Sequence, residues 1–324
     1  MARDQTPLGL NVQRKFRPDT SLPLPLNSAA MVREHWNLKA PPFDGSLEPA
    51  TFYSGGPQEE ALARLEWLAL ERQRFGLVVG AEGCGKSHLA AMAVRRLGGL
   101  GAEAVMLSLR GLAAGDWLEL LLDRLPLDPL SRAEPLRSWP KLENRLRENT
   151  LMERTTAIVF DDLDSAPSDA VEGITRLVGA AEPRYSRTVV VATVTPQGLA
   201  SVPLGLRQRA AVRIELSPWN VDDVGAFLAS SLHRVGGVEN IFSTDAIATL
   251  TRFAAGVPRV VSQLAQLSLI AAAGDQLPQI DAVTVERAWR ELAPSGAVET
   301  SPTEADDQTL PVNPRVRVVR RLWG

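Results

Sequence analysis

The sequence predicts an α/β fold in which a parallel sheet is flanked by helices and followed by a small all-α domain. Short aliphatic segments alternate with amphipathic helical patterns up to Leu216, and only helical patterns follow that residue. A glycine-rich segment typical of phosphate binding lies between the first predicted strand and the next helix. The 324 residues, 45% of them hydrophobic, suffice for about two domains with buried cores.

Five short segments rich in aliphatic and β-branched residues are the predicted strands. Four of them are near-continuous apolar runs, which is typical of strands that are covered on both faces. Strands that alternate with helices imply a parallel sheet with right-handed crossovers. The predicted strands are Phe75–Val79, Ala104–Leu109, Thr156–Phe160, Thr188–Ala192 and Val212–Leu216. The clearest helices of this part are Glu59–Gln73, Ser87–Leu97, Trp117–Leu125, Leu142–Met152 and Asp169–Ala181.

The second domain is predicted to contain helices alone. Ser243 and Asp281 precede two of these helices and are residue types that cap helix N-termini. The four predicted helices are Val221–Val235, Thr244–Ala255, Arg259–Ala273 and Ala282–Leu292. This pattern indicates a small helical lid behind the α/β domain.

The two ends of the chain have compositions that differ from the rest. Residues 1–34 are rich in proline and polar residues and are predicted to form an extended or disordered arm. The α/β domain then covers 35–216, the helical lid 217–292, and a flexible tail 293–324. The tail ends in RVRVVRRLWG, whose arginines interleave with apolar residues. This segment is either a docking peptide for a partner protein or a solvated tail.

The segment LVVGAEGCGKSHLAAM matches the phosphate-binding pattern G-x-x-x-x-G-K-[ST]. Glycines are needed there because the backbone must approach phosphates closely and adopt positive φ angles. Lys86 can reach the β and γ phosphates, and the Ser87 hydroxyl can ligate Mg²⁺. The sequence therefore predicts an ATP and Mg²⁺ site, with no catalytic role for His88. The predicted nucleotide-binding residues are Gly80, Ala81, Glu82, Gly83, Cys84, Gly85, Lys86, Ser87 and His88.

Cys84 is the single cysteine of the chain. It excludes an internal disulfide framework and is compatible with a reducing compartment, so we expect a cytoplasmic protein. Lys86 and the amides of the loop favour the thiolate form of Cys84, which would make the side chain reactive. The alternative is that Cys84 fills an unconstrained position of the loop.

The charge balance gives no general indication of nucleic-acid binding. The net charge is -3 and the pI is near 5.8, so the chain has no basic surplus. We find no apolar segment of signal-peptide type and no stretch of about 18 apolar residues. We therefore expect no direct membrane insertion.

Two adjacent carboxylates follow the third predicted strand in TTAIVFDDLDSA. Asp161 and Asp162 lie at the carboxyl end of a buried strand, where open α/β sheets bind ligands. Asp161 is predicted to hold Mg²⁺ through water, and Asp162 to orient or deprotonate the attacking water. Alternatively, Asp161, Asp162 and Asp164 are turn or cap residues.

With these motifs the chain resembles the AAA+ ATPases, and in detail the ExeA/GspA branch tied to general secretion and pilus systems. HWNLKAPPF at His35–Phe43 and QEEALARL at Gln58–Leu65 match the opening segment and the Glu-Ala helix of that family. The similarity covers about His35–Leu292. The family normally has Asp-Glu as its acid pair. Asp162 is one methylene shorter, which affects the expected hydrolysis rate more than nucleotide binding.

The resemblance implies a sensor residue and an arginine finger. TVVVATVTPQGL is similar to the sensor strand of the family, in which Thr195 is the best match and Thr193 the alternative. LRQRAAVRIEL is similar to the arginine-finger segment, in which Arg209 is the best match and Arg207 the weaker one. A finger acts on the nucleotide of a neighbouring subunit, so the resemblance implies a homo-oligomer.

The lid also carries a motif of the family. GVPRVVSQL at Gly256–Leu264 is similar to GxPRxxNxL, so Arg259 is implied to be the sensor that touches the γ-phosphate. Ser262 stands where the family usually has Asn. Pro41–Phe43 and Tyr53 are either part of an adenine pocket or ordinary packing residues.

Three functions are compatible with these features. The first is an ATPase that remodels or assembles a secretion or pilus-type machine, with a protein of that machine as partner. The second is a DNA-associated AAA+ regulator of the transposition type, which the acidic pI and the lack of a recognisable helix-turn-helix disfavour. The third is a nucleotide-dependent switch that hydrolyses slowly, which Asp162 suggests.

Overall fold

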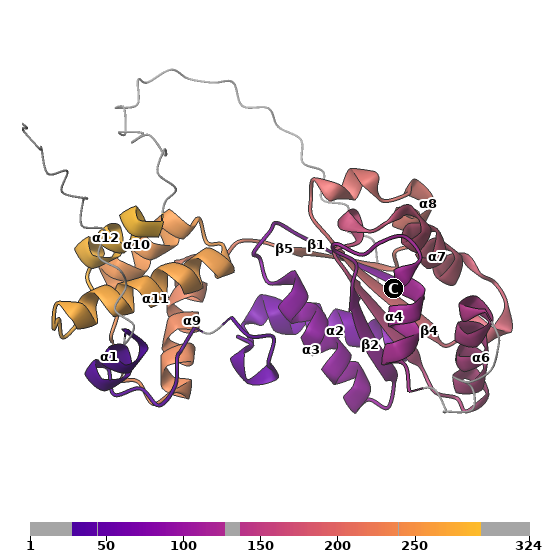
Figure 1. Cartoon of the computed structure of the whole chain (residues 1–324), viewed down its shortest axis with the longest axis horizontal. Helices are drawn as coiled ribbons and strands as arrows, with labels where there is room; N and C mark the ends of the chain where they lie inside the picture. The colour runs from indigo at the N-terminus through magenta and orange to yellow at the C-terminus, as the bar shows by residue number, and fades with distance from the viewer. Residues whose placement is uncertain (1–27, 44, 127–136, 239, 293–324) are drawn as a thin grey trace, which may run out of the picture.

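The computed structural model describes residues 28–43, 45–126, 137–238 and 240–292. Two parts follow one another along the long axis of the molecule (Figure 1). One part is a sheet with helices on both faces, and the other is a group of helices. The chain passes from the first to the second directly after the last strand of the sheet.

The sheet contains five strands that are all parallel to their neighbours. Its spatial order is β2-β3-β4-β1-β5, so β1 lies between two strands that come late in the chain. This architecture confirms the predicted α/β class with a parallel sheet. The strands are β1 Phe75–Gly80, β2 Glu103–Ser108, β3 Thr156–Asp161, β4 Thr188–Val194 and β5 Val212–Leu216.

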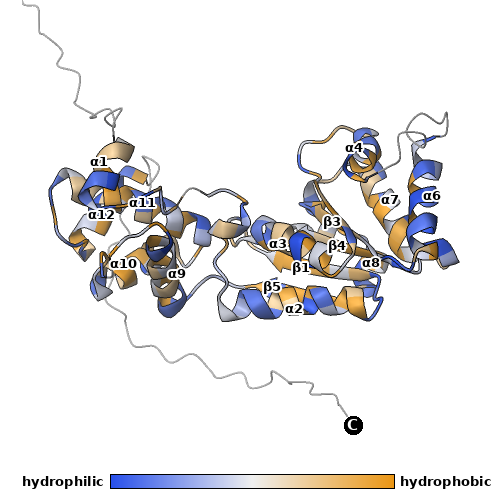
Figure 2. Ribbon diagram, turned by 90° about the horizontal axis from the view of Figure 1, so that it is seen from below, coloured by the Kyte–Doolittle hydropathy of each residue, from blue (hydrophilic) through white to orange (hydrophobic). Residues whose placement is uncertain are grey.

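Helices cover both faces of the sheet and bury alternating residues of its strands. Val78 and Val159 pack with α2 and α3 on one face, whereas Leu77 and Phe160 belong to the core on the other face, with α4, α6 and α7. This alternation follows from the two-residue period of a strand, and Figure 2 shows the apolar interior as orange strands and helix faces. The helices are α2 Gly56–Leu70, α3 Lys86–Gly99, α4 Asp116–Arg124, α6 Ser138–Leu151, α7 Ser168–Gly179 and the short α8 Leu204–Gln208.

Four helices form the second part, which we call the lid. Its core is continuous, and the buried side chains come from all four helices. Ser243 Oγ accepts a hydrogen bond of 3.1 Å from the Ala246 amide, and Asp281 Oδ1 accepts one of 2.8 Å from the Thr284 amide. Both predicted N-caps are therefore confirmed. The lid helices are α9 Val221–Arg234, α10 Thr244–Ala254, α11 Pro258–Gly274 and α12 Ala282–Leu292.

The predicted arm is wrong for the part of it that the structure describes. Residues Ser28–His35 form helix α1, which packs against α11 of the lid (Figures 1 and 2). Val32, Trp36 and Leu38 are buried in the lid core, and Trp36 Nε1 donates a hydrogen bond of 3.2 Å to the Leu269 carbonyl. Burial of these apolar side chains stabilises the packing of this segment on the lid. Residues 1–27 lie outside the described residues.

The segment after α1 therefore begins on the lid and returns to the sheet. We call residues 36–43 and 45–55 the strap. Lys39 N donates a hydrogen bond of 2.9 Å to the Val235 carbonyl, so the start of the strap is bound to the lid. The predicted boundary at residue 35, which assigned this segment to the α/β domain, is wrong for Trp36 and Leu38 because their apolar side chains lie in the lid core. None of the described helices is both long enough and apolar enough to span a membrane.

Candidate nucleotide site

The phosphate-binding loop connects the end of β1 to the start of α3. Gly83 and Gly85 have φ angles of 79° and 90°, a region that other residues rarely adopt. Gly80 approaches the neighbouring strand β5 closely, since a Cβ atom placed on it would lie 3.1 Å from Leu216 Cβ. These glycines allow the tight turn that places the unpaired first amides of α3 at the loop, where they can bind an anion.

Lys86 lies inside this loop. Its side chain is buried, and Nζ donates hydrogen bonds of 2.8 Å and 3.1 Å to the carbonyls of Gly80 and Ala81. The first turn of α3 also contacts the strap, because His88 Nε2 is hydrogen-bonded to the Ser46 carbonyl. The loop therefore combines a cation, free amides and a helix N-terminus in one place.

The acid pair lies at the end of β3, beside the loop. The Asp161 side chain is buried, and its carboxylate accepts a hydrogen bond from Thr193 Oγ1. The same hydroxyl oxygen accepts a hydrogen bond of 2.9 Å from the Asp162 amide. Thr193 on β4 thus orients the Asp161 carboxylate and fixes the Asp162 backbone. Asp162 adopts φ 59° and ψ 50°, a left-handed conformation that Asp tolerates better than most residues.

The carboxylate of Asp162 is paired with an arginine. Arg110 follows β2, and its Nε and one terminal nitrogen donate hydrogen bonds of 3.1 Å and 3.3 Å to the two Asp162 oxygens. Arg110 also lies 3.6 Å from a carboxylate oxygen of Glu82 in the loop. The hydrogen bond to Asp162 raises the pKa of Arg110 above its usual value, so this guanidinium stays charged.

The lid contacts the phosphate-binding loop directly. The Arg259 amide donates a hydrogen bond of 3.2 Å to the Gly83 carbonyl. A Cβ atom on Gly83 would lie 2.9 Å from Val257 Cγ1 and 3.1 Å from Arg259 Cβ, so only glycine permits this approach. Arg259 is the second residue of α11 and its side chain lines the cleft between the lid and the loop.

Aromatic side chains form the wall of the cleft farther from the sheet. Trp219 and Phe227 of the lid lie with their ring centroids 4.9 Å apart, and Tyr53 of the strap lies 5.5 Å from Trp219. Phe43 packs on Phe227 at 5.6 Å. Burial, followed by the charge of Asp223, raises the pKa of Tyr53, so its hydroxyl stays neutral. Flat apolar surfaces of this kind bind the face of an aromatic ring.

The residues that line this cleft fit a magnesium nucleotide. Its volume is about 970 Å³, within the range of ligand pockets. Lys86 and Arg259 supply positive charge for phosphates, and the aromatic wall supplies an apolar surface for a base. Ser87 and Asp161 supply a hydroxyl and a carboxylate oxygen, the ligand types that Mg²⁺ prefers. These two residues could hold the metal.

Solved structures share the arrangement of sheet and lid. Cdc6p from Pyrobaculum aerophilum superposes with a TM-score of 0.61 at 17% identity, over 76% of this chain and 70% of that one. The RuvB Holliday junction branch migration motor of Thermotoga maritima superposes with a TM-score of 0.52 at 15% identity, over 76% of this chain and 72% of that one. The fold is that of the AAA+ P-loop ATPases. The ORC2 protein of Aeropyrum pernix superposes with a TM-score of 0.55 at 12% identity, over 73% of this chain and 67% of that one.

A curated relative agrees with the resemblance of the chain's motifs. General secretion pathway protein A of Aeromonas hydrophila is 26% identical over 248 residues, which are 75% of this chain. The chain matches 45% of the length of that relative, so less than half of the relative is represented here. No protein-family model matches the chain. The resemblance to the ExeA/GspA branch is thus supported by a relative of that name.

The structure does not bring Thr195 to the nucleotide cleft. Its hydroxyl and amide both donate to Asp164 Oδ2, and Gly198 N donates a hydrogen bond of 3.0 Å to Thr195 Oγ1. Thr195 therefore stabilises the turn after β4. Thr193, which the sequence left as the alternative, contacts both aspartates of the acid pair instead. The geometry therefore favours Thr193 over Thr195 as the sensor candidate, because β4 extends to Val194, two residues beyond its predicted end.

The two arginines at the end of α8 differ in exposure. Arg209 is exposed, and one of its terminal nitrogens donates a hydrogen bond of 2.9 Å to the Gly205 carbonyl. Arg207 is half-buried, and its Nε has no hydrogen-bond partner among the described residues. Neither side chain lines the cleft of its own chain. Of the two, Arg209 is accessible to a second molecule.

Burial opposes the predicted reactivity of Cys84. The side chain is buried, and this burial raises the pKa of the thiol above its usual value of 9.0. Lys86 and a hydrogen bond with Ala81 lower the pKa, but their combined effect is smaller. The predicted preference for the thiolate is therefore wrong, since loss of hydration outweighs the neighbouring charge.

The structure also identifies two cleft residues that sequence reasoning missed. Arg110 contacts Asp162 across 52 positions of the sequence, and a lone arginine after a strand gives no signal of such a contact. Trp219 belongs to the link between β5 and α9, where Trp219 N donates a hydrogen bond of 2.8 Å to the Gly256 carbonyl. An aromatic residue at the domain junction is the one signal that could have indicated it.

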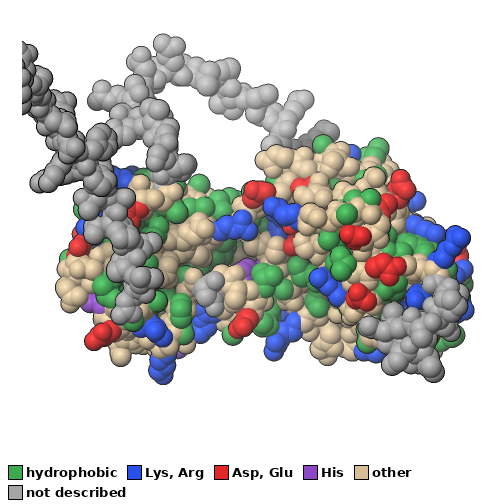
Figure 3. Space-filling model, in the orientation of Figure 1, with side chains coloured by type: hydrophobic (Ala, Val, Ile, Leu, Met, Phe, Trp, Pro, Cys, Tyr) green, Lys and Arg blue, Asp and Glu red, His purple; other side chains and the backbone are tan. Residues whose placement is uncertain are grey.

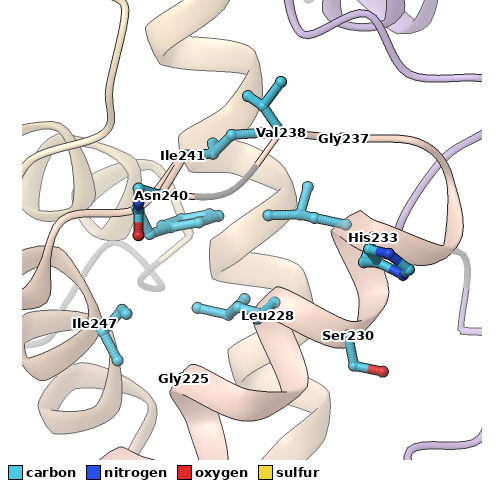
Figure 4. Close-up of a pocket in the computed structure, with 12 residues that line it drawn as sticks. Gly225, Leu228, Ser230, His233, Gly237, Val238, Asn240, Ile241 and Ile247 are labelled. Carbon is cyan, nitrogen blue, oxygen red and sulfur yellow. The ribbon is translucent and has the colours of Figure 1, made fainter.

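A second hollow lies on the lid, away from the phosphate loop. It measures about 540 Å³ and lies between α9, the loop residues 237–238 and 240–242, and the start of α10 (Figure 4). Leu228, Ile241 and Ile247 make it mainly apolar, and His233 and Asn240 are at its rim. It brings together no acid pair and no cation cluster. Over the face in Figure 3, basic, acidic and apolar side chains are interspersed, so that face shows no large patch of one charge.

Proposed function

We propose that this protein binds and hydrolyses Mg-ATP in the cleft between the sheet and the lid. One observation supports the proposal above all others: a single cleft is lined by Lys86 of the loop, the acid pair Asp161 and Asp162, and Arg259 of the lid. In P-loop proteins these residue types bind phosphates, hold the metal and activate water. The likeness to AAA+ structures supports the same conclusion at the level of the fold.

Each of these side chains has a role in the proposed reaction. Lys86 binds the β and γ phosphates, and Ser87 and Asp161 hold Mg²⁺, which when bound neutralises phosphate charge. Asp162 accepts the proton of the attacking water, as a general base does. Arg259 contacts the γ-phosphate from the lid, so that closure of the lid completes the site and excludes water other than the attacking molecule.

The proposal extends to oligomerisation and to a partner. Arg209 is exposed and lies outside its own cleft, so we assign it to the nucleotide of a neighbouring subunit. The relative named General secretion pathway protein A supports a role in remodelling or assembling a secretion machine. We place this activity in the cytoplasm, with a protein of that machine as the partner.

A slow nucleotide switch is the second function with structural support. The pairing of Asp162 with Arg110 favours it, because both carboxylate oxygens are hydrogen-bonded to the guanidinium and one must be released before it can accept a proton from water. Under this alternative the protein signals by its bound nucleotide and hydrolyses it slowly.

Nucleotide binding by a Lys86 variant tests the proposal. Loss of the ammonium removes a charge-assisted contact, so we expect Lys86→Ala to weaken Mg-ATP binding by about 100-fold. Lys39→Ala is the matched control, since Lys39 is exposed and lies outside the cleft. The measurement is isothermal titration calorimetry with Mg-ATP. Equal affinities of the wild-type protein and Lys86→Ala would refute the site.

A further inference from the structure

Two buried amide oxygens in the nucleotide cleft have no hydrogen-bond partner among the residues that the structure describes. They are Oε1 of Gln58, at the start of α2, and Oε1 of Gln266, in the middle of α11. Both residues line the cleft, one from the α/β domain and one from the lid. Buried amide oxygens are normally paired, and an unpaired one is destabilising. Two such acceptors on one cleft indicate a ligand that carries N–H donors.

Gln58 lies against the aromatic wall. A Cβ atom placed on Gly55 would lie 2.8 Å from Gln58 Oε1 and 2.9 Å from Tyr53 Cε1, so the amide oxygen and the ring border the same space. A glutamine at the third position of a helix can also bond back to the amide before the helix. Gln58 Oε1 makes no such bond to Gly55 and has no other partner among the described residues. This buried acceptor is therefore unpaired next to the surface that suits a base.

Gln266 lies far from the phosphate end of the cleft. It follows Arg259 by seven residues, which is about 10 Å along the helix axis. Arg259, Ser262, Gln263 and Gln266 all line the cleft, and their spacing is that of one helix face. Because the Arg259 amide contacts the loop at Gly83, this polar face of α11 runs from the phosphates toward the opposite end. A nucleotide extended along it places its base near Gln266.

We propose that Gln58 and Gln266 are specificity-determining residues that select adenine. Their amide oxygens accept hydrogen bonds from the exocyclic 6-amino group of a base that rests on the aromatic wall. This amine carries two hydrogens, which matches two acceptors. The inference rests on the proposed function, and it adds which groups recognise the base. A site built to bond an amine rejects a ligand without one, because the acceptors then stay buried and unpaired.

A nucleotide that lacks only the amine tests this inference. Purine riboside 5′-triphosphate has hydrogen at position 6 and otherwise equals ATP. We expect the full-length wild-type protein to bind Mg-ATP about 10-fold more tightly than this analogue in isothermal titration calorimetry. Gln58→Met and Gln266→Met should each reduce that preference by weakening ATP binding alone. Gln73→Met, a change at a glutamine outside the cleft, should leave the preference unchanged.

The outcomes separate this inference from the proposed function. Failure of the wild-type protein to bind either triphosphate contradicts the nucleotide site itself. Equal binding of both by the wild-type protein overturns only the role of the two glutamines, and this comparison requires no variant to fold. Variants that keep the preference, or that lose affinity equally for both ligands, also overturn it. Gln58→Glu retains an acceptor, so it should keep the preference while its charge lowers both affinities.

Discussion

The backbone of Asp162 explains why an aspartate stands at this position. Its left-handed conformation, with φ 59°, is one that Asp and Asn adopt more readily than longer side chains. We expect Asp162→Asn to keep the fold and ATP binding but to lower turnover by about 100-fold or more, because the amide cannot accept the proton of water. Steady-state turnover and ATP affinity, measured on the same preparation, test this.

The Asp162→Glu variant is compared with Asp162→Asn to test the effect of the left-handed backbone on stability. The ExeA/GspA branch that the motifs resemble normally has Glu here, yet the left-handed backbone of this chain disfavours Glu by about 1 kcal/mol or more. We therefore expect Asp162→Glu to lower the melting temperature relative to Asp162→Asn. Unchanged turnover in Asp162→Asn would assign the base to another residue.

Arg110 determines how available the Asp162 carboxylate is. The pair is partly exposed, with 57% of the Arg110 side chain accessible, so its energetic effect is modest. If the pair restrains the base, Arg110→Ala should raise basal turnover by about 2- to 5-fold. Arg110→Lys keeps the charge without the two-point contact, so its basal turnover should lie between those of the wild type and Arg110→Ala. Lower turnover in Arg110→Ala would instead show that Arg110 orients Asp162 for the reaction.

The sequence predicted the residues of the site whose motifs are local, and missed those that depend on distant contacts. The loop from Gly80 to Ser87 and the acid pair are contiguous segments with defined neighbours, so their places followed from the chain alone. Arg110 and Trp219 reach the cleft through strand order and domain packing, which no local pattern encodes.

At the scale of elements, the strands were more predictable than the helix ends. Each predicted strand lies within two residues of the observed one at either end, because buried strands leave unbroken apolar runs. Helix α2 was expected over Glu59–Gln73 but spans Gly56–Leu70. It begins early because Pro57 suits a first turn, and it ends early because Arg72 adopts φ 53° while Gln73 N bonds to the Leu68 carbonyl.

The N-caps of the lid helices permit a prediction with a defined pH dependence. Hydrogen bonds from the Thr284 amide and then its hydroxyl lower the pKa of Asp281 below its usual value of 3.8. A lowered folded-state pKa contributes stability above the unfolded-state pKa, and this contribution is lost as pH falls through the folded-state pKa. We expect Asp281→Ala to lower the free energy of unfolding by about 1 kcal/mol at pH 7, and by less below pH ~4.

Ser243→Ala is the matched control for this cap. Ser243 caps α10 through an uncharged hydroxyl, so its substitution should also cost about 1 kcal/mol but show no dependence on pH from the cap itself. Denaturant unfolding of both variants and the wild type, at several pH values, gives the difference in the free energy of unfolding between each variant and the wild type. A pH-independent effect of Asp281→Ala would show that the carboxylate charge does not contribute.

At the scale of the whole molecule, the strap joins the lid to the phosphate loop a second time. Arg234 of α9 donates hydrogen bonds of 2.7 Å to the carbonyls of both Pro42 and Ala50, and Ser46 between them is bonded to His88 of α3. The other connection is the contact of Arg259 with Gly83. Movement of the lid therefore acts on the loop and on the first turn of α3 together. This geometry suits a protein that converts nucleotide state into domain motion.

The proposed oligomer predicts that two inactive variants restore one another. Arg209 lies outside its own cleft, so it can stabilise transition-state charge only on another subunit, and Arg209→Ala should lower turnover by about 1000-fold while ATP binding persists. In a mixture with Lys86→Ala, some interfaces combine an intact loop with an intact Arg209, and turnover should partly return. Mixing Arg209→Ala with the double variant Lys86→Ala/Arg209→Ala forms no such interface and should restore nothing. Recovery in both mixtures, or in neither, would show that Arg209 does not act between subunits.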